Sequence, residues 1–310
     1  MELVPLQLAF VGNHQWGRAC LASRDPVLHS AVGHVVAFTV AAIYWRIGLK
    51  NARSPARWNP RLCYCLVAIA QLILALVVLS TLTYVATAIG FPLRDQLLLS
   101  WDRALGFEFR TYLGFINAHP LILLIFGPTY SSITWQLVAM TLILPLAGCY
   151  RRIGQAICAF MFALLATTIV SIFVPAIGVY GTLGLTAADH PFFEPQGYYD
   201  TLRDAPLLRA GALRALDIWK LGGVLTFPSF HAATAVLYIW AFWPLVWLRP
   251  AAIVWNVAMI AATPLGGGHY LVDILAGIMV TLLAITAVQL LGSFLPLAPL
   301  GSTEWVHKEA

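Results

Sequence analysis

The fold is decided by long apolar runs such as residues 62–90, which read LCYCLVAIAQLILALVVLSTLTYVATAIG and contain no charged residue. A helix needs about 20 residues to cross the hydrocarbon layer of a membrane, so this run is long enough to span it. Inside a bilayer every backbone N–H and C=O group must find its hydrogen-bond partner within the protein, which favours a helix over an open strand. Residues 62–90 are therefore predicted to form a transmembrane helix.

The whole chain has the composition of a membrane protein. Of its 310 residues, 60% are apolar and only 10% are charged, and the mean hydropathy is +0.82. A soluble domain carries about 25% charged residues because its surface faces water. The sequence predicts an all-α, polytopic transmembrane helix bundle with seven spans, near residues 31–49, 62–90, 121–149, 153–178, 229–248, 250–267 and 270–296.

The basic residues indicate how the bundle is oriented. The net charge of +5 and the pI of about 9.0 do not indicate nucleic-acid binding, because the Lys and Arg residues lie in loops between spans. Alternating spans place these loops on two faces. The loops at 50–61 and 150–152 are short, basic and free of acidic residues, and the positive-inside rule assigns such loops to the cytoplasm. The face with residues 91–120 and 179–228 is then non-cytoplasmic.

The two long connections on that second face are more than linkers. Residues 94–119 mix charged residues with Leu, Phe and Trp101, a composition typical of a helix that lies in the membrane interface. Residues 179–228 are too long for a simple link between helices, and we expect them to fold over the chemistry described next.

Two short segments carry that chemistry. FPSFH (residues 227–231) opens the fifth predicted span, and GGGHYLVD (residues 266–273) opens the seventh. Between them the chain crosses the membrane and returns, so both segments lie at the same face. This conclusion does not depend on which face is cytoplasmic.

His269 and Asp273 are four residues apart, which places both on one side of a helix. The Asp273 carboxylate can hold the imidazole in one tautomer, which leaves the other ring nitrogen free to attack a phosphorus atom. Ionisable residues within a transmembrane helix are costly and are read as functional by default, although a structural His–Asp pair that closes a helix end has the same spacing. His231 supplies what the pair lacks, a proton donor for the leaving oxygen.

The surroundings of these side chains suit a phosphate group. Two helix N-termini present free N–H groups to one place, which favours an anion. Ser229 can donate a hydrogen bond to a phosphate oxygen or cap the fifth helix, and Gly268 either lets the backbone approach a ligand or serves as a hinge. We therefore predict His269, Asp273 and His231 as catalytic residues and Ser229 and Gly268 as phosphate-binding ones. No metal and no cofactor is predicted, because the nucleophile is a side chain.

FPSFH followed about 38 residues later by HYLVD resembles the second and third signatures of the type 2 phosphatidic acid phosphatase superfamily, membrane branch. The resemblance implies that His269 forms a phospho-enzyme, that Asp273 orients it and that His231 is the acid and base. It also implies six core helices, which the last six predicted spans would match, with the first span as an addition. The predicted organisation is an N-terminal segment with the extra span (1–61), a membrane domain (62–296) and a C-terminal tail (297–310).

Two features of that superfamily are absent. No Lys is followed seven residues later by Arg-Pro, and Ala262-Thr263 stands where Ser-Arg usually precedes the third signature. FPS-x-H with Thr263 and HY-x-VD is instead similar to the inositol phosphorylceramide synthase and sphingomyelin synthase branch. WDRALG (101–106) and LRAG (208–211) resemble outer-loop motifs of its bacterial relatives, and Asp102 and Arg103 within the first are expected to form an interfacial ion pair.

The missing basic residues leave the phosphate short of cations. Arg209 lies on the correct face and is the predicted phosphate-binding replacement, ahead of Arg203 and Lys220. A guanidinium that faces solvent or lipid headgroups is the alternative interpretation of Arg209.

The sequence thus predicts a membrane-embedded enzyme that transfers phosphoryl groups from a lipid phosphate or phosphodiester through a phospho-histidine, as a phosphatase or a head-group phosphotransferase. Its expected partners are a lipid substrate and water or a small polar alcohol, with no nucleic acid. We expect it in a bacterial inner membrane with its site on the periplasmic face. The alternative is a proton-coupled transporter that uses the His/Asp cluster, but the ionisable groups gather at one face rather than at the membrane midplane.

Overall fold

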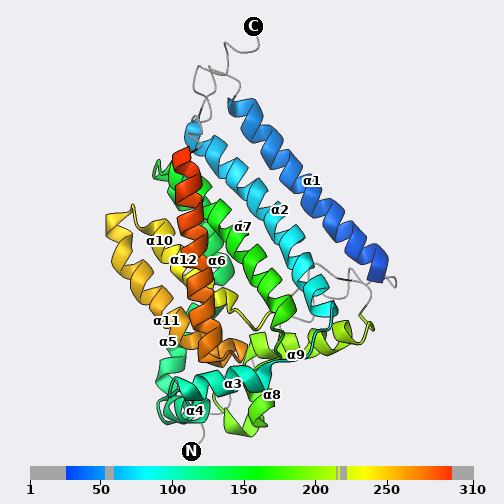
Figure 1. Cartoon of the computed structure of the whole chain (residues 1–310). Coiled ribbons are helices and arrows are strands. Elements are labelled where there is room, and N and C mark those ends of the chain that lie inside the picture. The colour runs from blue at the N-terminus through cyan, green and yellow to red at the C-terminus, as the bar shows by residue number, and fades with distance from the viewer. Residues whose placement is uncertain (1–25, 53–58, 214–215, 217–221, 295–310) are drawn as a thin grey trace, which may run out of the picture.

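The computed structural model describes residues 26–52, 59–213, 216 and 222–294. Within these ranges the chain forms only α-helices and short 3-10 helices and no strand, which confirms the predicted all-α class (Figure 1). The elements in chain order are α1 (Pro26–Ala52), α2 (Pro60–Ala88), α3 (Asp95–Ala104), α4 (Phe109–Ala118), η4 (Pro120–Ile122), α5 (Leu123–Ser131), α6 (Ile133–Leu146), α7 (Tyr150–Phe173), α8 (Val179–Leu183), η5 (Ala187–Asp189), α9 (Gln196–Arg209), α10 (Phe230–Phe242), η6 (Val246–Leu248), α11 (Arg249–Gly267) and α12 (Leu271–Phe294).

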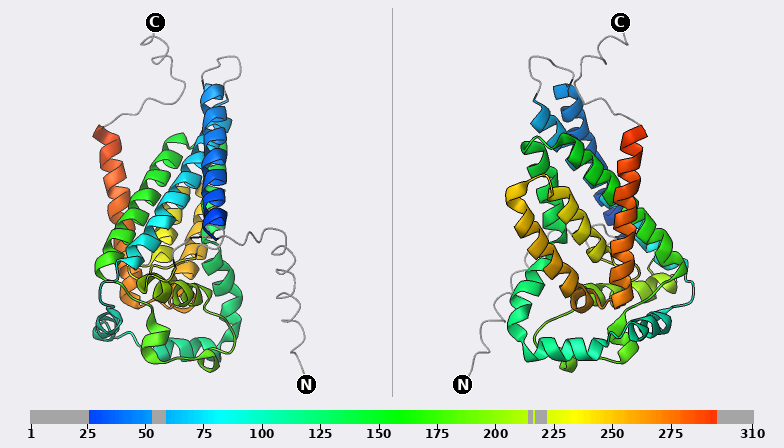
Figure 2. Two further views of the ribbon diagram at one scale, coloured as in Figure 1. Left: turned by 90° about the vertical axis from the view of Figure 1, so that its right-hand side faces the viewer. Right: turned by 60° about the vertical axis from the view of Figure 1, so that its left-hand side comes forward.

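The helices form two sets (Figures 1 and 2). The long helices α1, α2, α7, α11 and α12 run along the molecule, whereas α3, α4, α8 and α9 lie across its lower end in the view of Figure 1. In the described part of the chain, four helical segments are long and apolar enough to cross a membrane, and they cover Pro60–Ala88, Tyr150–Phe173, Val246–Gly267 and Leu271–Leu291. The helices over Phe109–Ala118 and Pro120–Ser131 meet at 93° and add a fifth if they are taken as one broken span. The chain is thus an integral membrane protein.

Two of the seven predicted spans differ from the structure. Residues 121–149 are divided among η4, α5 and α6 rather than forming one helix, and α6 has only 14 residues. Residues 229–248 give the 13-residue α10 and the separate η6, since Pro244 cannot continue a helix. Neither α6 nor α10 reaches the length of about 20 residues that a full crossing requires. Apolar length in the sequence therefore overstates helix length here.

The predicted N-terminal span falls within α1, which packs along α2. Val35–Gly48 of this helix is apolar but shorter than the four candidate spans, so a crossing by this segment stays a prediction. The thiol of Cys63 donates to the carbonyl of Gly48 with a separation of 3.3 Å between sulfur and oxygen. Side-chain atoms of Val67 would lie 3.0 Å from a Cβ at Gly48, so the absence of a side chain there permits the close approach. The predicted C-terminal tail, residues 297–310, lies outside the described residues.

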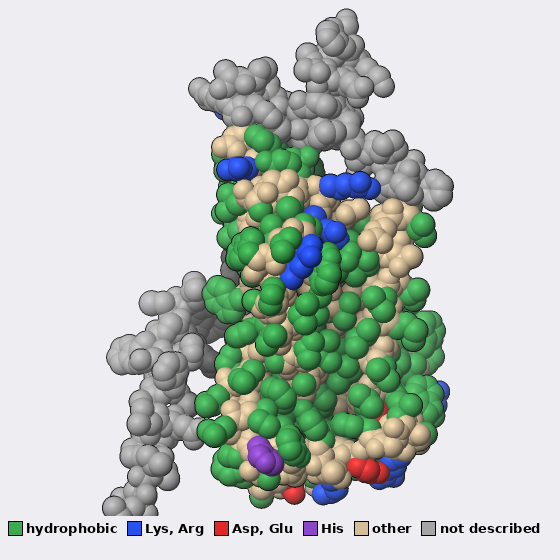
Figure 3. All heavy atoms as spheres, turned by 90° about the vertical axis from the view of Figure 1, so that its left-hand side faces the viewer, with side chains coloured by type: hydrophobic (Ala, Val, Ile, Leu, Met, Phe, Trp, Pro, Cys, Tyr) green, Lys and Arg blue, Asp and Glu red, His purple; other side chains and the backbone are tan. Residues whose placement is uncertain are grey.

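A buried apolar core joins the long helices, with members from α2, α6, α7, α10 and α12 that include Leu72, Met140, Phe160, Leu237 and Ile285. The flanks of the bundle are covered by apolar side chains in the face that Figure 3 shows. Lys and Arg side chains appear toward both ends of that face, and acidic side chains appear only toward the lower end. This distribution is expected when the middle of the bundle is surrounded by lipid.

The two long connections fold into the layer at the lower end, as predicted. Residues 94–119 supply α3 and α4, and α3 turns Leu98, Leu99 and Asp102 inward. Residues 179–228 supply α8, η5 and α9, and α9 is tied to the end of α2. The hydroxyl of Tyr84 donates to Asp204 Oδ2 at 2.8 Å and accepts from the N–H of Gly222 at 3.0 Å. These bonds fix the start of the segment that leads into FPSFH.

Candidate active site

The N-terminal ends of α10 and α12 are joined directly. The N–H of Ser229 donates to the backbone carbonyl of Asp273 at 2.9 Å, and the hydroxyl of Thr281 donates to the carbonyl of Ala233 at 2.9 Å. A Cβ at Gly277 would overlap the Ser229 carbonyl oxygen, so only glycine permits this approach. The two segments singled out in the sequence therefore meet, although about 38 residues separate them.

His269 follows a tight turn at the end of α11. Gly268 adopts the left-handed conformation with φ of 66°, which favours glycine, and α12 begins directly after His269 and Tyr270. His269 Nδ1 lies 3.2 Å from Asp273 Oδ2, and the N–H of Tyr270 donates to the same oxygen at 3.0 Å. Both members of the pair are inside the protein, with 4% of His269 and 0% of Asp273 exposed. With Nδ1–H donating to the carboxylate, Nε2 carries a free lone pair.

His231 lies in the first turn of α10, where its imidazole stacks on the phenol ring of Tyr130 from α5. The ring centroids are 4.0 Å apart and the planes differ by 6°. A Cβ at Gly267 would lie 2.6 Å from Nε2 of His269 and 2.9 Å from the hydroxyl of Tyr130. Tyr130 thus borders His231 and the glycine turn that carries His269. No pattern in the sequence around Tyr130 predicts its contacts with His231 and the glycine turn, because these contacts join residues far apart in the chain.

The two predicted phosphate-binding residues on these segments already have partners within the fold. Ser229 is the N-cap of α10, and its hydroxyl accepts from the N–H of Ala232 at 3.4 Å. The carbonyl of Gly268 accepts from the N–H of Val179 at 2.8 Å. The capping interpretation of Ser229 therefore holds, and phosphate binding by either residue stays a prediction.

The glycine turn is held from below by α3, which is the main feature that sequence reasoning missed. Asp102 is 1% exposed, and its carboxylate accepts from the N–H groups of Leu271 and Val272 at 2.8 and 2.9 Å. Asp102 thus caps the N-terminus of α12. The expected Asp102–Arg103 ion pair is wrong, because Arg103 pairs with Glu108 at 3.5 Å. Burial raises the pKa of the Asp102 carboxyl, and the two N–H groups oppose that rise.

A second carboxylate of α3 extends this support. Asp95 accepts from the N–H groups of Ile177 and Gly178, with Oδ1 at 3.0 and 2.9 Å, and from the hydroxyl of Tyr270 at 3.0 Å. One side chain therefore links α3, the segment before α8 and the residue next to His269. The WDRALG motif identified Asp102 in the sequence, but the groups that donate hydrogen bonds to Asp102 could be found only from the three-dimensional arrangement.

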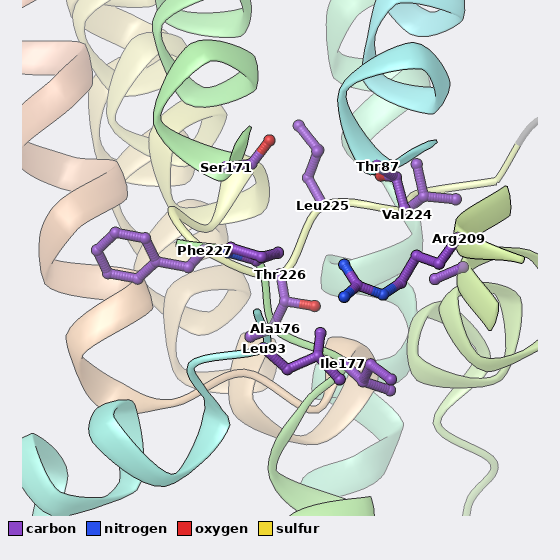
Figure 4. A pocket seen from close by; sticks show the side chains of 12 residues that line it. Thr87, Leu93, Ser171, Ala176, Ile177, Arg209, Val224, Leu225, Thr226 and Phe227 are labelled. Atoms are coloured by element: carbon purple, nitrogen blue, oxygen red, sulfur yellow. The ribbon is translucent and has the colours of Figure 1, made fainter. Parts of the chain in front are cut away.

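Arg209 lines a small cavity beside the FPSFH segment (Figure 4), and none of the three predicted catalytic side chains is part of that lining. Its Nη2 donates to the carbonyl of Phe91 at 2.7 Å, which ties α9 to the end of α2. Its Nη1 is buried without a hydrogen-bond partner, as is the hydroxyl of Thr226, and Figure 4 shows both side chains directed into the cavity. The cavity measures about 20 Å³, enough for one water-sized group.

Arg203 and Lys220 are the two weaker candidates for a phosphate-binding cation. Arg203 forms ion pairs with Asp200 at 3.0 Å and Asp204 at 2.6 Å, so its charge serves α9 itself. Lys220 lies outside the described residues.

Comparison with protein families gives one finding that bears on this geometry. The model of the PAP2 superfamily matches residues 96–287, which include α3, both signature segments and the helices between them. Comparisons with curated proteins and with solved structures give no match.

Replacing Asp102 by Asn tests the support from α3. An amide has one acceptor oxygen, so one N–H at the start of α12 loses its partner and faces an NH₂ group. We expect the free energy of unfolding to fall by about 1–2 kcal/mol and phosphoryl transfer to fall about tenfold, because misplaced catalytic groups react slowly. Glu108→Gln, which breaks the exposed pair with Arg103, is the matched control and should change neither quantity. Equal effects from both variants would contradict the capping role.

Proposed function

This chain belongs to the PAP2 superfamily, whose members are phosphatases and phosphotransferases, and we propose that it transfers a phosphoryl group from a membrane lipid through a phospho-histidine at His269. The observation that carries the proposal is the bond between His269 Nδ1 and Asp273 Oδ2 at 3.2 Å. It leaves Nε2 unprotonated beside Gly267, in the turn that Tyr130 borders, and Tyr130 in turn stacks on His231.

The proposed reaction has two steps. In the first, Nε2 of His269 attacks the phosphorus atom, the bond from phosphorus to the leaving oxygen breaks, and His231 gives that oxygen a proton. In the second, water or an alcohol attacks the phospho-histidine while His231 takes its proton, and the phosphorus–nitrogen bond breaks. Asp273 stabilises the positive charge on the His269 ring during both steps.

The negative charge on the phosphoryl oxygens needs donors. The N-terminal ends of α10 and α12 meet at the proposed site. The dipole of α10 favours an anion there, whereas the first N–H groups of α12 already donate to Asp102 and are not free for a ligand, contrary to the sequence-based expectation. We propose that Ser229 and Gly268 border the phosphate and that Arg209 supplies a cation from beside the site, from the small cavity that it shares with Thr226 (Figure 4). The buried, unpartnered Nη1 and hydroxyl support this assignment, because such groups are costly unless a ligand or water pairs with them.

The acceptor decides between phosphatase and transferase. The combination of FPS-x-H, Thr263 and HY-x-VD favours a head-group phosphotransferase that resembles inositol phosphorylceramide synthase. Thr263 is buried in α11, with its hydroxyl donating to the carbonyl of Met259 at 2.8 Å, so the position contributes no cation. The superfamily membership also favours an enzyme over a proton-coupled transporter. An assay of purified protein with lipid phosphates and phosphodiesters, with and without inositol, separates the two reactions.

We further propose that the protein lies in a bacterial inner membrane with His231 and His269 at the periplasmic face. In the described part of the chain, every acidic residue outside α12 belongs to α3, η5, α9 or the loops of the lower layer. Among the described residues, the opposite end carries Arg61, Arg151, Arg152 and Arg249 and no acidic residue. Ends rich in Arg and free of acids favour the cytoplasm.

The catalytic assignment predicts the activities of three variants of the purified, reconstituted protein. His269→Ala should lose at least about 1,000-fold in turnover of a lipid phosphate, because it removes the nucleophile. Asp273→Asn should lose activity through the wrong tautomer of His269. His119→Ala is the control, since that histidine is exposed at the C-terminal end of α4, where its ring Nδ1 lies 2.9 Å from the carbonyl oxygen of Phe115. Turnover by His269→Ala within tenfold of the wild-type rate would refute the assignment.

The proposed role of Arg209 is tested by Arg209→Lys, with Arg110→Lys as a matched control. Each arginine donates Nη2 to a backbone carbonyl in the lower layer, at 2.7 Å from Arg209 and 2.6 Å from Arg110. Only Arg209 also directs a free nitrogen into the cavity. Lys cannot supply the second nitrogen, so Arg209→Lys should lower kcat/KM by about tenfold or more and Arg110→Lys should not. Equal, mild losses would show that both residues serve only the fold.

The orientation is tested with single cysteines at two exposed positions, Arg61→Cys and Glu194→Cys, in a variant whose own cysteines are replaced by Ser. In intact cells a membrane-impermeant maleimide should label position 194 and should reach position 61 only after the cells are broken. The reverse labelling pattern would place His231 and His269 on the cytoplasmic face.

A further inference from the structure

A second, larger cavity lies at the opposite end of the bundle from His231 and His269. It is shallow and open to the surface, with a volume of about 350 Å³, and it is formed where the turn between α6 and α7 meets the end of α10. Its lining consists of Gly148, Cys149, Tyr150, Arg151, Arg152, Gln155 and Pro244. The proposed catalytic chemistry does not use it, since α7 begins at the upper end in Figure 1 and α12 begins at the lower end.

The cavity is basic and contains no acidic residue. Arg152 lies over the ring of Trp240, with 4.2 Å between the guanidinium carbon and the ring centroid. Its Nη1 is buried and has no hydrogen-bond partner, whereas Arg151 beside it is exposed. The first turn of α7 has no side-chain cap, so its free N–H groups add positive potential to the same wall. Together these groups favour an oxyanion.

The residues around the cavity place it at the level of a membrane–water interface. Trp243 directly precedes Pro244 and Trp247 follows it by three residues, and they are 45% and 72% exposed. Arg249 lies 4.8 Å from the centroid of the Trp243 ring and donates Nε to the carbonyl of Trp243 at 2.7 Å. Exposed Trp residues with Arg beside them are typical of the headgroup region, where lipid phosphates lie.

We propose that this cavity binds the phosphate of an anionic membrane lipid, in the leaflet opposite to the catalytic site. Arg151 and Arg152 hold the phosphate oxygens through charge-assisted hydrogen bonds, and the lipid's acyl chains lie along the apolar flank of α10 and α11. The bound lipid fixes the α6–α7 turn against the end of α10. The inference concerns this chain's own arginines and does not depend on the reaction catalysed at the other end.

The proposal is tested by native mass spectrometry of the full-length protein in detergent, titrated with phosphatidylglycerol or phosphatidylcholine. The wild type should bind at least one phosphatidylglycerol about tenfold more tightly than phosphatidylcholine. The variant with Arg151→Gln and Arg152→Gln should lose that preference. Because Arg152 also packs on Trp240, the exposed Arg151→Gln is measured alone and should weaken binding about threefold or more. Arg61→Gln, at the same end but outside the cavity, is the control and should bind like the wild type.

A third titration with inorganic phosphate separates a lipid from a soluble anion. Millimolar phosphate should not displace the lipid. Displacement by phosphate, an equal affinity of the wild type for both lipids, or an equal loss in Arg61→Gln and the double variant would each overturn the proposal.

Discussion

The geometry of the site depends on the hydrogen bond from the Ser229 N–H to the Asp273 carbonyl and on the glycine that allows it. α10 and α12 approach so closely at this point that Gly277 has no room for a Cβ. In lipid, helices gain little from apolar contact with each other, so close packing over small residues and hydrogen bonds between helices must hold them together. Here the same contact brings His231 and His269 to one end of the bundle.

The lower layer extends this constraint to the turn that carries His269. Asp102 and Asp95 of α3 accept hydrogen bonds from Leu271, Val272 and Tyr270. Two carboxylates that take no part in the proposed reaction therefore position the segment next to His269. A carboxylate at the N-terminus of a transmembrane helix also offsets the charge of the helix dipole. The outer layer is therefore part of the site's scaffold and more than a cover over it.

Much of this arrangement could be predicted from the sequence. The long apolar runs predicted the transmembrane helices. Because the chain crosses the membrane and returns between FPSFH and GGGHYLVD, the number of spans predicted that both segments lie at one end of the bundle. The spacing of His269 and Asp273 predicted their contact, since it lies within one helical turn. Each of these inferences uses local information.

The features that escaped prediction depend on contacts between distant residues. The stacking of Tyr130 on His231 and the capping of α12 by Asp102 join residues about 100 or more positions apart. The division of residues 121–149 into several helices could not be found by hydropathy alone, which reports apolar character and not backbone direction. The sequence places Arg209 on the correct face, but its cavity and the Thr226 hydroxyl that also faces this cavity required the structure.

The central claim is that His269 forms a covalent phosphoryl intermediate, and trapping that intermediate tests it most directly. Purified protein with His231→Ala should be mixed with a lipid phosphate labelled with ³²P and bearing a good leaving group, then denatured within milliseconds and digested under alkaline conditions. The account predicts an acid-labile, alkali-stable phosphate on the peptide that contains His269, and none when His269 is replaced by Ala. Label on another residue, or turnover of the substrate with no label on the protein, would contradict the account.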